Sequence, residues 1–160
     1  MVRAYDTEVE MTQMVLPSDT NNHGTAFGGQ IAAWVDICAA VSAQRFCRNH
    51  VVTASMDALH FMHPVHKGMV VILKSRVNCA WETSMEVGVR VEAENPLTGD
   101  ILHCCSAYLT FVSINETGKP QPLPKLDSCD DPELLSHLEK ANIRRKMRLE
   151  IRKMRKSKNL

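Results

Sequence analysis

Residues 25–45 read TAFGGQIAAWVDICAAVSAQR and form the longest apolar run of the chain. The length and alanine content of this run favour a helix over a strand. Only one ionisable side chain, that of Asp36, interrupts its middle. At helical spacing, the face that carries this carboxylate otherwise holds small residues, namely Gly29, Ala32, Ala33 and Ala40. A carboxylate in such a place either is satisfied by a group that packs close to it or takes part in a reaction.

The composition is that of one soluble globular domain with some additional chain. The sequence has 160 residues, of which 44% are hydrophobic and 23% are charged. The acidic N-terminus, MVRAYDTEVE, lacks the apolar core of a secretory signal, and Asp36 interrupts the longest apolar run, so no transmembrane helix is expected. The six cysteines show no CxxC pairing, which favours free thiols in a reducing compartment. We therefore expect a cytoplasmic protein.

Most of the remaining chain has the patterning of β-strands. Strands are predicted where side chains alternate or run apolar between turn residues, over 7–16, 51–61, 69–79, 84–94 and 101–114. One strand, one long helix and four strands joined by short turns indicate an α+β fold, with an antiparallel sheet curled around the helix. Residues 1–126 are expected to form this domain. Residues 127–160 are expected to form a linker, over 127–132, and a basic C-terminal helix, over 133–156.

Four segments, taken in order, resemble the hotdog-fold acyl-CoA thioesterases. They are PSDTNNHGTAFGGQIAAWVDICAA at 17–40, VTASMDALHF at 52–61, HPVHKG at 63–68 and ETSMEVGVRVEAE at 82–94. The chain is similar to the small bacterial acyl-CoA thioester hydrolases and to single domains of the two-domain cytosolic acyl-CoA hydrolases of animals. The ordered set, rather than any one motif, makes the resemblance specific.

The resemblance implies a hotdog fold, in which an antiparallel sheet of about five strands wraps a long central helix. It implies hydrolysis of fatty acyl-CoA to free fatty acid and CoA, with no cofactor, since coenzyme A is part of the substrate and product. It further implies that two such domains pair as a homodimer, often within a trimer of dimers that makes a hexamer. The active site would lie between the paired domains.

The family's catalytic pair maps onto Asn21 and Asp36. One partner supplies an Asn from the loop before its helix, and the other supplies an Asp from the helix itself. Asn21 and Asn22 both lie in a polar loop of turn residues, and the choice of Asn21 rests on alignment with the family loop. Asp36 would act as general base or as nucleophile. Backbone N–H groups at the start of a helix lack intrahelical partners and suit an oxyanion hole, here those of Phe27, Gly28 and Gly29.

Two further positions have alternative interpretations. Thr83 and Ser84 resemble a family position near the pantetheine or nucleotide of CoA, and they equally suit the cap of a hairpin. His60, His63 and His66 invite a metal site. Strand alternation, however, puts His60 and His63 on opposite faces and Pro64 breaks the run, so no metal is expected.

The charge is divided unevenly along the chain. Residues 144–160 hold nine of the 19 Lys and Arg and one acid, giving +8, whereas residues 1–143 carry −7. We favour a solvated helix that lies on the acidic body or on a neighbouring subunit. Attraction of CoA phosphates to the mouth of the site is the second interpretation. Binding of nucleic acid or of a membrane is the third, and neither partner is expected, because aromatic residues and a strong apolar stripe are missing from the tail.

Two other functions are compatible with a hotdog fold. A non-catalytic acyl-CoA-binding regulator is the main alternative, although such proteins usually carry a DNA-binding helix-turn-helix and none is visible here. A hotdog dehydratase or hydratase is disfavoured, because the histidine context that its chemistry requires is missing.

Overall fold

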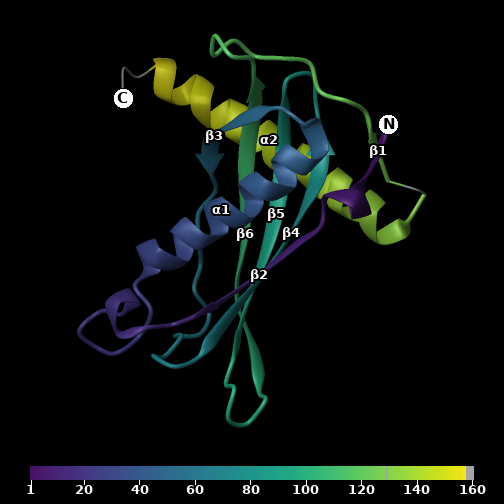
Figure 1. Cartoon of the computed structure of the whole chain (residues 1–160). Helices are drawn as coiled ribbons and strands as arrows, with labels where there is room; N and C mark the ends of the chain where they lie inside the picture. The colour runs from purple at the N-terminus through teal and green to yellow at the C-terminus, as the bar shows by residue number, and fades with distance from the viewer. Residues whose placement is uncertain (129, 158–160) are drawn as a thin grey trace.

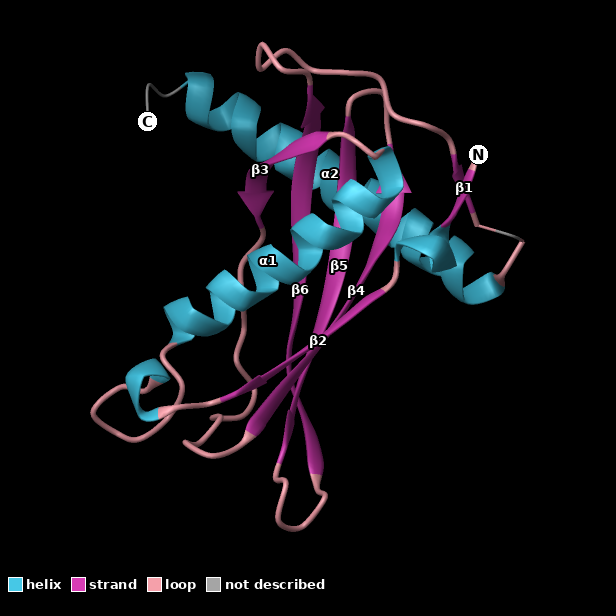
Figure 2. Ribbon diagram, in the orientation of Figure 1, coloured by secondary structure: helices cyan, strands magenta, loops and turns pink. Residues whose placement is uncertain are grey.

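The elements follow the predicted order of one strand, a long helix, four strands and a C-terminal helix (Figures 1 and 2). The computed structural model describes residues 1–128 and 130–157. The main elements are β2 (Val9–Met14), α1 (Gly28–Cys47), β3 (His50–Met56), β4 (Val70–Ala80), β5 (Ser84–Glu94), β6 (Ile101–Ile114) and α2 (Pro132–Ser157). Short elements complete the chain: β1 (Val2–Arg3), η1 (Ala4–Thr7), η2 (Pro17–Asp19) and β7 (Leu126–Asp127).

Five strands form one antiparallel sheet in the order β2-β4-β5-β6-β3. The long hairpin of β4 and β5 is its centre, with Val70 opposite Glu94 and Ala80 opposite Met85. In the described part of the chain β3 pairs with β6 alone, so β3 forms one edge of the sheet and β2 the other. Figure 2 shows the strands twisting as they pass beneath α1. The curled sheet around a long helix confirms the predicted fold class.

Helix α1 packs on one face of the sheet because its apolar residues recur at helical spacing. Its buried side chains are Ile31, Trp34, Val35, Cys38, Ala39, Ser42, Ala43 and Phe46. They meet the inward-facing valines and leucines of the sheet in one continuous core. Within this contact, the Ser75 hydroxyl on β4 donates to the Cys38 carbonyl at 3.0 Å and lies 2.7 Å from the Ser42 hydroxyl. The opposite side of α1, with Gly29, Ala33 and Ile37, is exposed.

Helix α2 packs on the other face of the sheet, behind the strands in the view of Figure 1. Leu134 and Ala141 are its buried contacts. Polar bonds fix it along its length: the Tyr5 hydroxyl donates to Asp131, and the Trp81 indole donates to Asn142 at 3.0 Å. The favoured interpretation of the basic tail, a helix that lies on the body of the protein, therefore describes α2.

The structure differs from the predicted boundaries at the two ends of the domain. The first predicted strand begins only at Val9, because Thr7 ends the η1 turn and its buried hydroxyl accepts a hydrogen bond from the Val77 N–H at 3.0 Å. Asp127, the first residue of the predicted linker, is the last residue of β7, which pairs in parallel with β1. Elements of two residues carry no periodicity that a sequence could reveal. The predicted strand over 51–61 ends at Met56.

Candidate functional site

Asp36 lies on the open side of α1, beside the edge strand β3. The Thr53 hydroxyl on β3 donates a hydrogen bond of 2.8 Å to its carboxylate. Asp36 is half-buried, and the neighbouring Ala33 and Ile37 on the same helix are exposed. The carboxylate is thus held in place from one direction and open to a ligand from another, as a general base or nucleophile must be.

Asn21 is engaged within its own loop. Its side-chain oxygen accepts hydrogen bonds from the N–H of His23 at 2.9 Å and of Thr25 at 3.3 Å, and its amide nitrogen donates to the Thr25 hydroxyl at 2.9 Å. The residue is exposed. These bonds orient the amide while leaving it accessible. No hydrogen bond joins Asn21 to Asp36 within the described residues of this single chain.

The start of α1 narrows the predicted set of oxyanion donors. The Phe27 N–H donates to the Asp19 carbonyl at 2.8 Å, so it is occupied, and the expectation that it is free is corrected. The chain turns at η2 just before the helix, which brings that carbonyl within reach. Gly28 and Gly29 are the first two residues of α1, where N–H groups have no intrahelical acceptor. The exposed rings of Phe61 and Phe27 lie over these two glycines, so a side chain at Gly29 would displace the Phe27 ring.

Thr83 and Ser84 lie at the turn between β4 and β5, on the side of the sheet that α2 covers. The Ser84 carbonyl accepts from the Trp81 N–H at 2.8 Å, so the pair does close the hairpin. Both residues also line a hollow of about 950 Å³ between the end of β3, the sheet and the C-terminal half of α2. The two interpretations of this pair are therefore compatible.

Five arginines of α2 line this hollow: Arg144, Arg145, Arg148, Arg152 and Arg155. Arg144 and Arg148 are paired with acidic side chains, and the Arg145 guanidinium lies over the Trp81 ring at 4.4 Å from its centre. Arg152 and Arg155 have no ion-pair or hydrogen-bond partner among the residues that the structure describes. The hollow therefore has an excess of positive charge and suits an anionic ligand.

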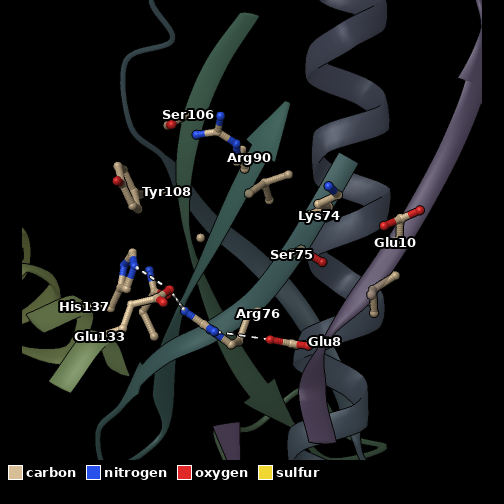
Figure 3. A pocket seen from close by; sticks show the side chains of 14 residues that line it. Glu8, Glu10, Lys74, Ser75, Arg76, Arg90, Ser106, Tyr108, Glu133 and His137 are labelled. Carbon is tan, nitrogen blue, oxygen red and sulfur yellow. Dashed lines mark hydrogen bonds and ion pairs between the residues drawn. The ribbon is translucent and has the colours of Figure 1, made fainter. Parts of the chain in front are cut away.

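A second hollow, of about 660 Å³, lies on the same face of the sheet and has a different character (Figure 3). Each of its three cations is paired with an acid: Lys74 and Arg90 with Glu92, and Arg76 with Glu8 and Glu133. With its cations neutralised, this hollow is a poorer candidate for a phosphate-bearing ligand.

Two other classes of site, a metal centre and a membrane span, concern residues 1–128 and 130–157. No cluster of three or more His, Cys, Asp or Glu gathers there in a way that could hold a metal ion. Among those residues, too, no helix combines the length and the apolar character that crossing a bilayer requires.

Comparison with known proteins places the chain in a family. The model of the thioesterase superfamily matches residues 23–99. YkhA of Bacillus subtilis, named an uncharacterized acyl-CoA thioester hydrolase, is 38% identical over 88% of this chain and 83% of its own length. The chain belongs to the thioesterase superfamily. Mouse acyl-coenzyme A thioesterase 11 is 41% identical, but the match covers only 21% of the length of that mouse protein.

Solved structures agree with this assignment. An acyl-CoA hydrolase from Bacillus cereus superposes with a TM-score of 0.90 at 36% identity, covering 98% of this chain and 94% of that one. The acyl-CoA hydrolase of Staphylococcus aureus, solved with butyryl-CoA and CoA, has a TM-score of 0.89 at 29% identity and the same coverage. An apo-hexameric acyl-CoA thioesterase has a TM-score of 0.88 at 35% identity, covering 94% of this chain and 97% of that one.

Sequence reasoning did not single out Thr53 or the outer arginines of α2. Thr53 reads as one more residue of an alternating strand, and only the packing of β3 against α1 brings its hydroxyl to Asp36. The arginines did carry a signal, because Arg145, Arg148, Arg152 and Arg155 recur at spacings of three and four and so share one helical face.

Proposed function

We propose that this superfamily member hydrolyses fatty acyl-CoA to a free fatty acid and CoA, with Asp36 as the catalytic carboxylate. The observation that carries the proposal is the Asp36 carboxylate, held by Thr53 at 2.8 Å on the open face of α1. Small residues around it leave room for a thioester to approach.

The solved relatives support the choice of residues. Three structures of the S. aureus enzyme contain alanine variants of an asparagine, an aspartate and a threonine. Those positions are separated by 15 and then 17 residues in that protein, the spacings that separate Asn21, Asp36 and Thr53 here. We infer that the three residues act together in this chain as well.

The chemistry follows from the groups at hand. As general base, Asp36 takes a proton from water while the water oxygen adds to the thioester carbonyl carbon. The N–H groups of Gly28 and Gly29 stabilise the resulting oxyanion, and the positive end of the α1 dipole adds to this effect. The C–S bond then breaks, and the CoA thiolate takes up the proton. As nucleophile, the carboxylate would instead attack the carbonyl carbon and expel the CoA thiolate, which leaves a mixed anhydride; water then hydrolyses the anhydride to the fatty acid and regenerates the Asp36 carboxylate.

The α2 hollow is the proposed site for the phosphates of CoA. Arg152 and Arg155 have no ion-pair partner in the described part of the chain, and a guanidinium can bind phosphate oxygens through pairs of hydrogen bonds. Thr83 and Ser84 add hydroxyls to the lining of the same hollow. In this proposal residues 1–126 form the catalytic domain and residues 127–160 supply the arm that holds the nucleotide end of the substrate.

The edge strand β3 is the proposed contact with a second copy of the chain. Its outer backbone groups have no strand partner in the described residues, and such edges readily pair with another strand. Exposed apolar residues flank it on both sides of the sheet, with Ile37 on α1 and Met147 and Ile151 on α2. Pairing of two β3 strands would bury them and bring Asn21 of the partner subunit towards Asp36. The hexameric relatives support self-association, and we propose a homodimer within a trimer of dimers.

The test measures release of CoA from palmitoyl-CoA with a thiol reagent, in the presence of EDTA. Wild-type protein should turn over without an added cofactor. Asp36→Ala should reduce turnover to background while binding of the acyl-CoA is retained, and Asn21→Ala should lower kcat. Unchanged hydrolysis in Asp36→Ala would refute the mechanism. Tight binding without turnover in the wild type would instead favour a non-catalytic acyl-CoA-binding regulator.

A further inference from the structure

Glu86 is a buried carboxylate at the centre of the contact between the sheet and α2. Its side chain has 0% exposure and points away from α1. Arg144 donates to both of its oxygens, with the shortest bond at 2.6 Å, and Arg148 donates to it at 2.6 Å. The Asn78 amide adds a bond of 3.2 Å. All of these donors hold one residue that takes no part in the proposed chemistry.

The second acid of this cluster is Asp57, the residue that follows β3. Arg148 spans the two acids, because its other guanidinium nitrogen lies 3.2 Å from the Asp57 carboxylate. The Arg144 guanidinium lies over the Tyr108 ring, 3.7 Å from its centre. Two arginines are thus balanced by two carboxylates. Burial acts to lower the pKa of Arg144, but the hydrogen bond and charge of Glu86 outweigh it and raise that pKa. The cluster is a closed set of ion pairs with no charge left for a ligand.

The ion pairs of Arg144 and Arg148 bear on the placement of the next two arginines of α2, Arg152 and Arg155. Arg152 follows Arg148 by four residues on the same helical face, which is one turn or about 6 Å along the axis. Arg155 lies three residues further. Glu86 binds Arg144 and Arg148, so it ties this stretch of α2 to the sheet directly beside the hollow. Arg152 and Arg155, which have no partner among the described residues, line the hollow within the next two turns of the same helix.

We propose that Glu86 is a positioning residue for substrate binding, which orients α2 so that Arg152 and Arg155 meet the phosphates of CoA. The inference rests on the proposed hydrolysis of acyl-CoA and adds a division of labour among the α2 arginines. Arg144 and Arg148 lock the helix, whereas Arg152 and Arg155 contact the substrate.

Charge alone predicts the opposite effect of removing Glu86. Replacing a buried anion near a phosphate site by a neutral group makes the local potential more positive, and on that basis the substrate would bind more tightly. Loss of positioning makes it bind more weakly. The sign of the change in KM therefore separates the two roles.

The test compares an acyl-CoA with the matching acyl-pantetheine, which lacks the nucleotide and its phosphates. For Glu86→Gln we expect KM for the acyl-CoA to rise about tenfold, as for a lost charge-assisted contact, with kcat within about twofold of wild type. Neither constant should change for acyl-pantetheine. The matched control is Glu92→Gln on the same strand, whose partners Lys74 and Arg90 lie away from the α2 hollow, and it should behave as wild type.

A combined variant tests the route of the effect. Arg152→Gln with Arg155→Gln should raise KM for acyl-CoA by a similar factor, and adding Glu86→Gln should produce little further increase, since both changes remove the same contact. If Glu86→Gln does not fold, Glu86→Asp keeps the charge but shortens the side chain. Glu86→Asp should then raise KM for the acyl-CoA by less than about tenfold and leave KM for acyl-pantetheine unchanged.

The inference is overturned if Glu86→Gln leaves KM for acyl-CoA unchanged or lower, or loses equal activity on both substrates. Fully additive effects of the Glu86 and arginine changes would overturn it too. An unaltered KM in the Arg152 and Arg155 variant would also refute it, and would remove the phosphate site from the proposed function. Hydrolysis by Asp36 would be unaffected by that outcome, since it is judged by Asp36→Ala alone.

Discussion

The hydrogen bond from Thr53 to Asp36 gives the most direct test of the site. Thr53→Val removes the hydroxyl and keeps the shape and the β-branched side chain that an edge strand favours. The bond is 2.8 Å long and its acceptor is a carboxylate. Such charge-assisted bonds contribute about 1.5–3 kcal/mol. Because Thr53 is exposed and Asp36 is half-buried, we take the lower end, about 1.5 kcal/mol, which corresponds to a loss of roughly tenfold in kcat/KM.

The assay measures kcat/KM from CoA release, with one acyl-CoA as substrate, for the wild type, Thr53→Val and Thr53→Ser. Serine keeps the hydroxyl, so Thr53→Ser should retain most of the activity that Thr53→Val loses. Thermal unfolding of all three should agree within a few degrees, because the position is exposed. Wild-type rates in Thr53→Val, or equal losses in both variants, would show that the bond has no part in orienting Asp36.

Three other predictions concern assembly, thiols and pH. Ile37→Glu places a charge on an apolar residue beside Asp36 that is 55% exposed. Light scattering should show this variant to be a monomer, and the monomer should be inactive. The control Leu97→Glu, in the β5–β6 turn, should leave assembly intact. Burial raises the pKa of the Cys79 and Cys105 thiols to about 11. A thiol reagent at pH 8 should therefore label these two residues only after denaturation. Rapid labelling of either one in the native protein would contradict their burial. Burial and the nearby Arg76 lower the pKa of His137 below the ordinary histidine value of 6.5. The unfolded chain therefore takes up a proton before the folded one, and the free energy of unfolding should fall as the pH drops through 6.5. His137→Gln should lessen that fall, and an identical pH dependence in the variant would refute the prediction.

Much of the architecture could be predicted because its long elements have strong periodicity. The β5 strand is a clean case: its predicted range, 84–94, is the observed one, since alternate residues face the α1 core and the α2 side. The short strands β1 and β7 were missed because two residues show no period, and their pairing depends on contacts between distant parts of the chain.

The candidate site was only partly accessible from sequence. Asp36 was conspicuous as a lone carboxylate among small residues, and family resemblance pointed to Asn21. The availability of the Phe27 N–H was misjudged, because the carbonyl that occupies it belongs to Asp19, in a turn eight residues earlier in the chain. Thr53 could not be distinguished from its neighbours, because its role comes from a contact with a helix 17 residues away.

The sequence by itself determined the helix, the strands and the placement of an unusual carboxylate, since each follows from the spacing of residues close together in the chain. Only the tertiary structure decided which groups meet that carboxylate and what becomes of the basic tail. Glu86 shows the reason. It reads as an ordinary outward-facing residue of an alternating strand, yet α2 closes over it and makes it the buried partner of Arg144 and Arg148. Burial and ion pairing arise between segments about 60 residues apart, and local spacing carries no information about such contacts.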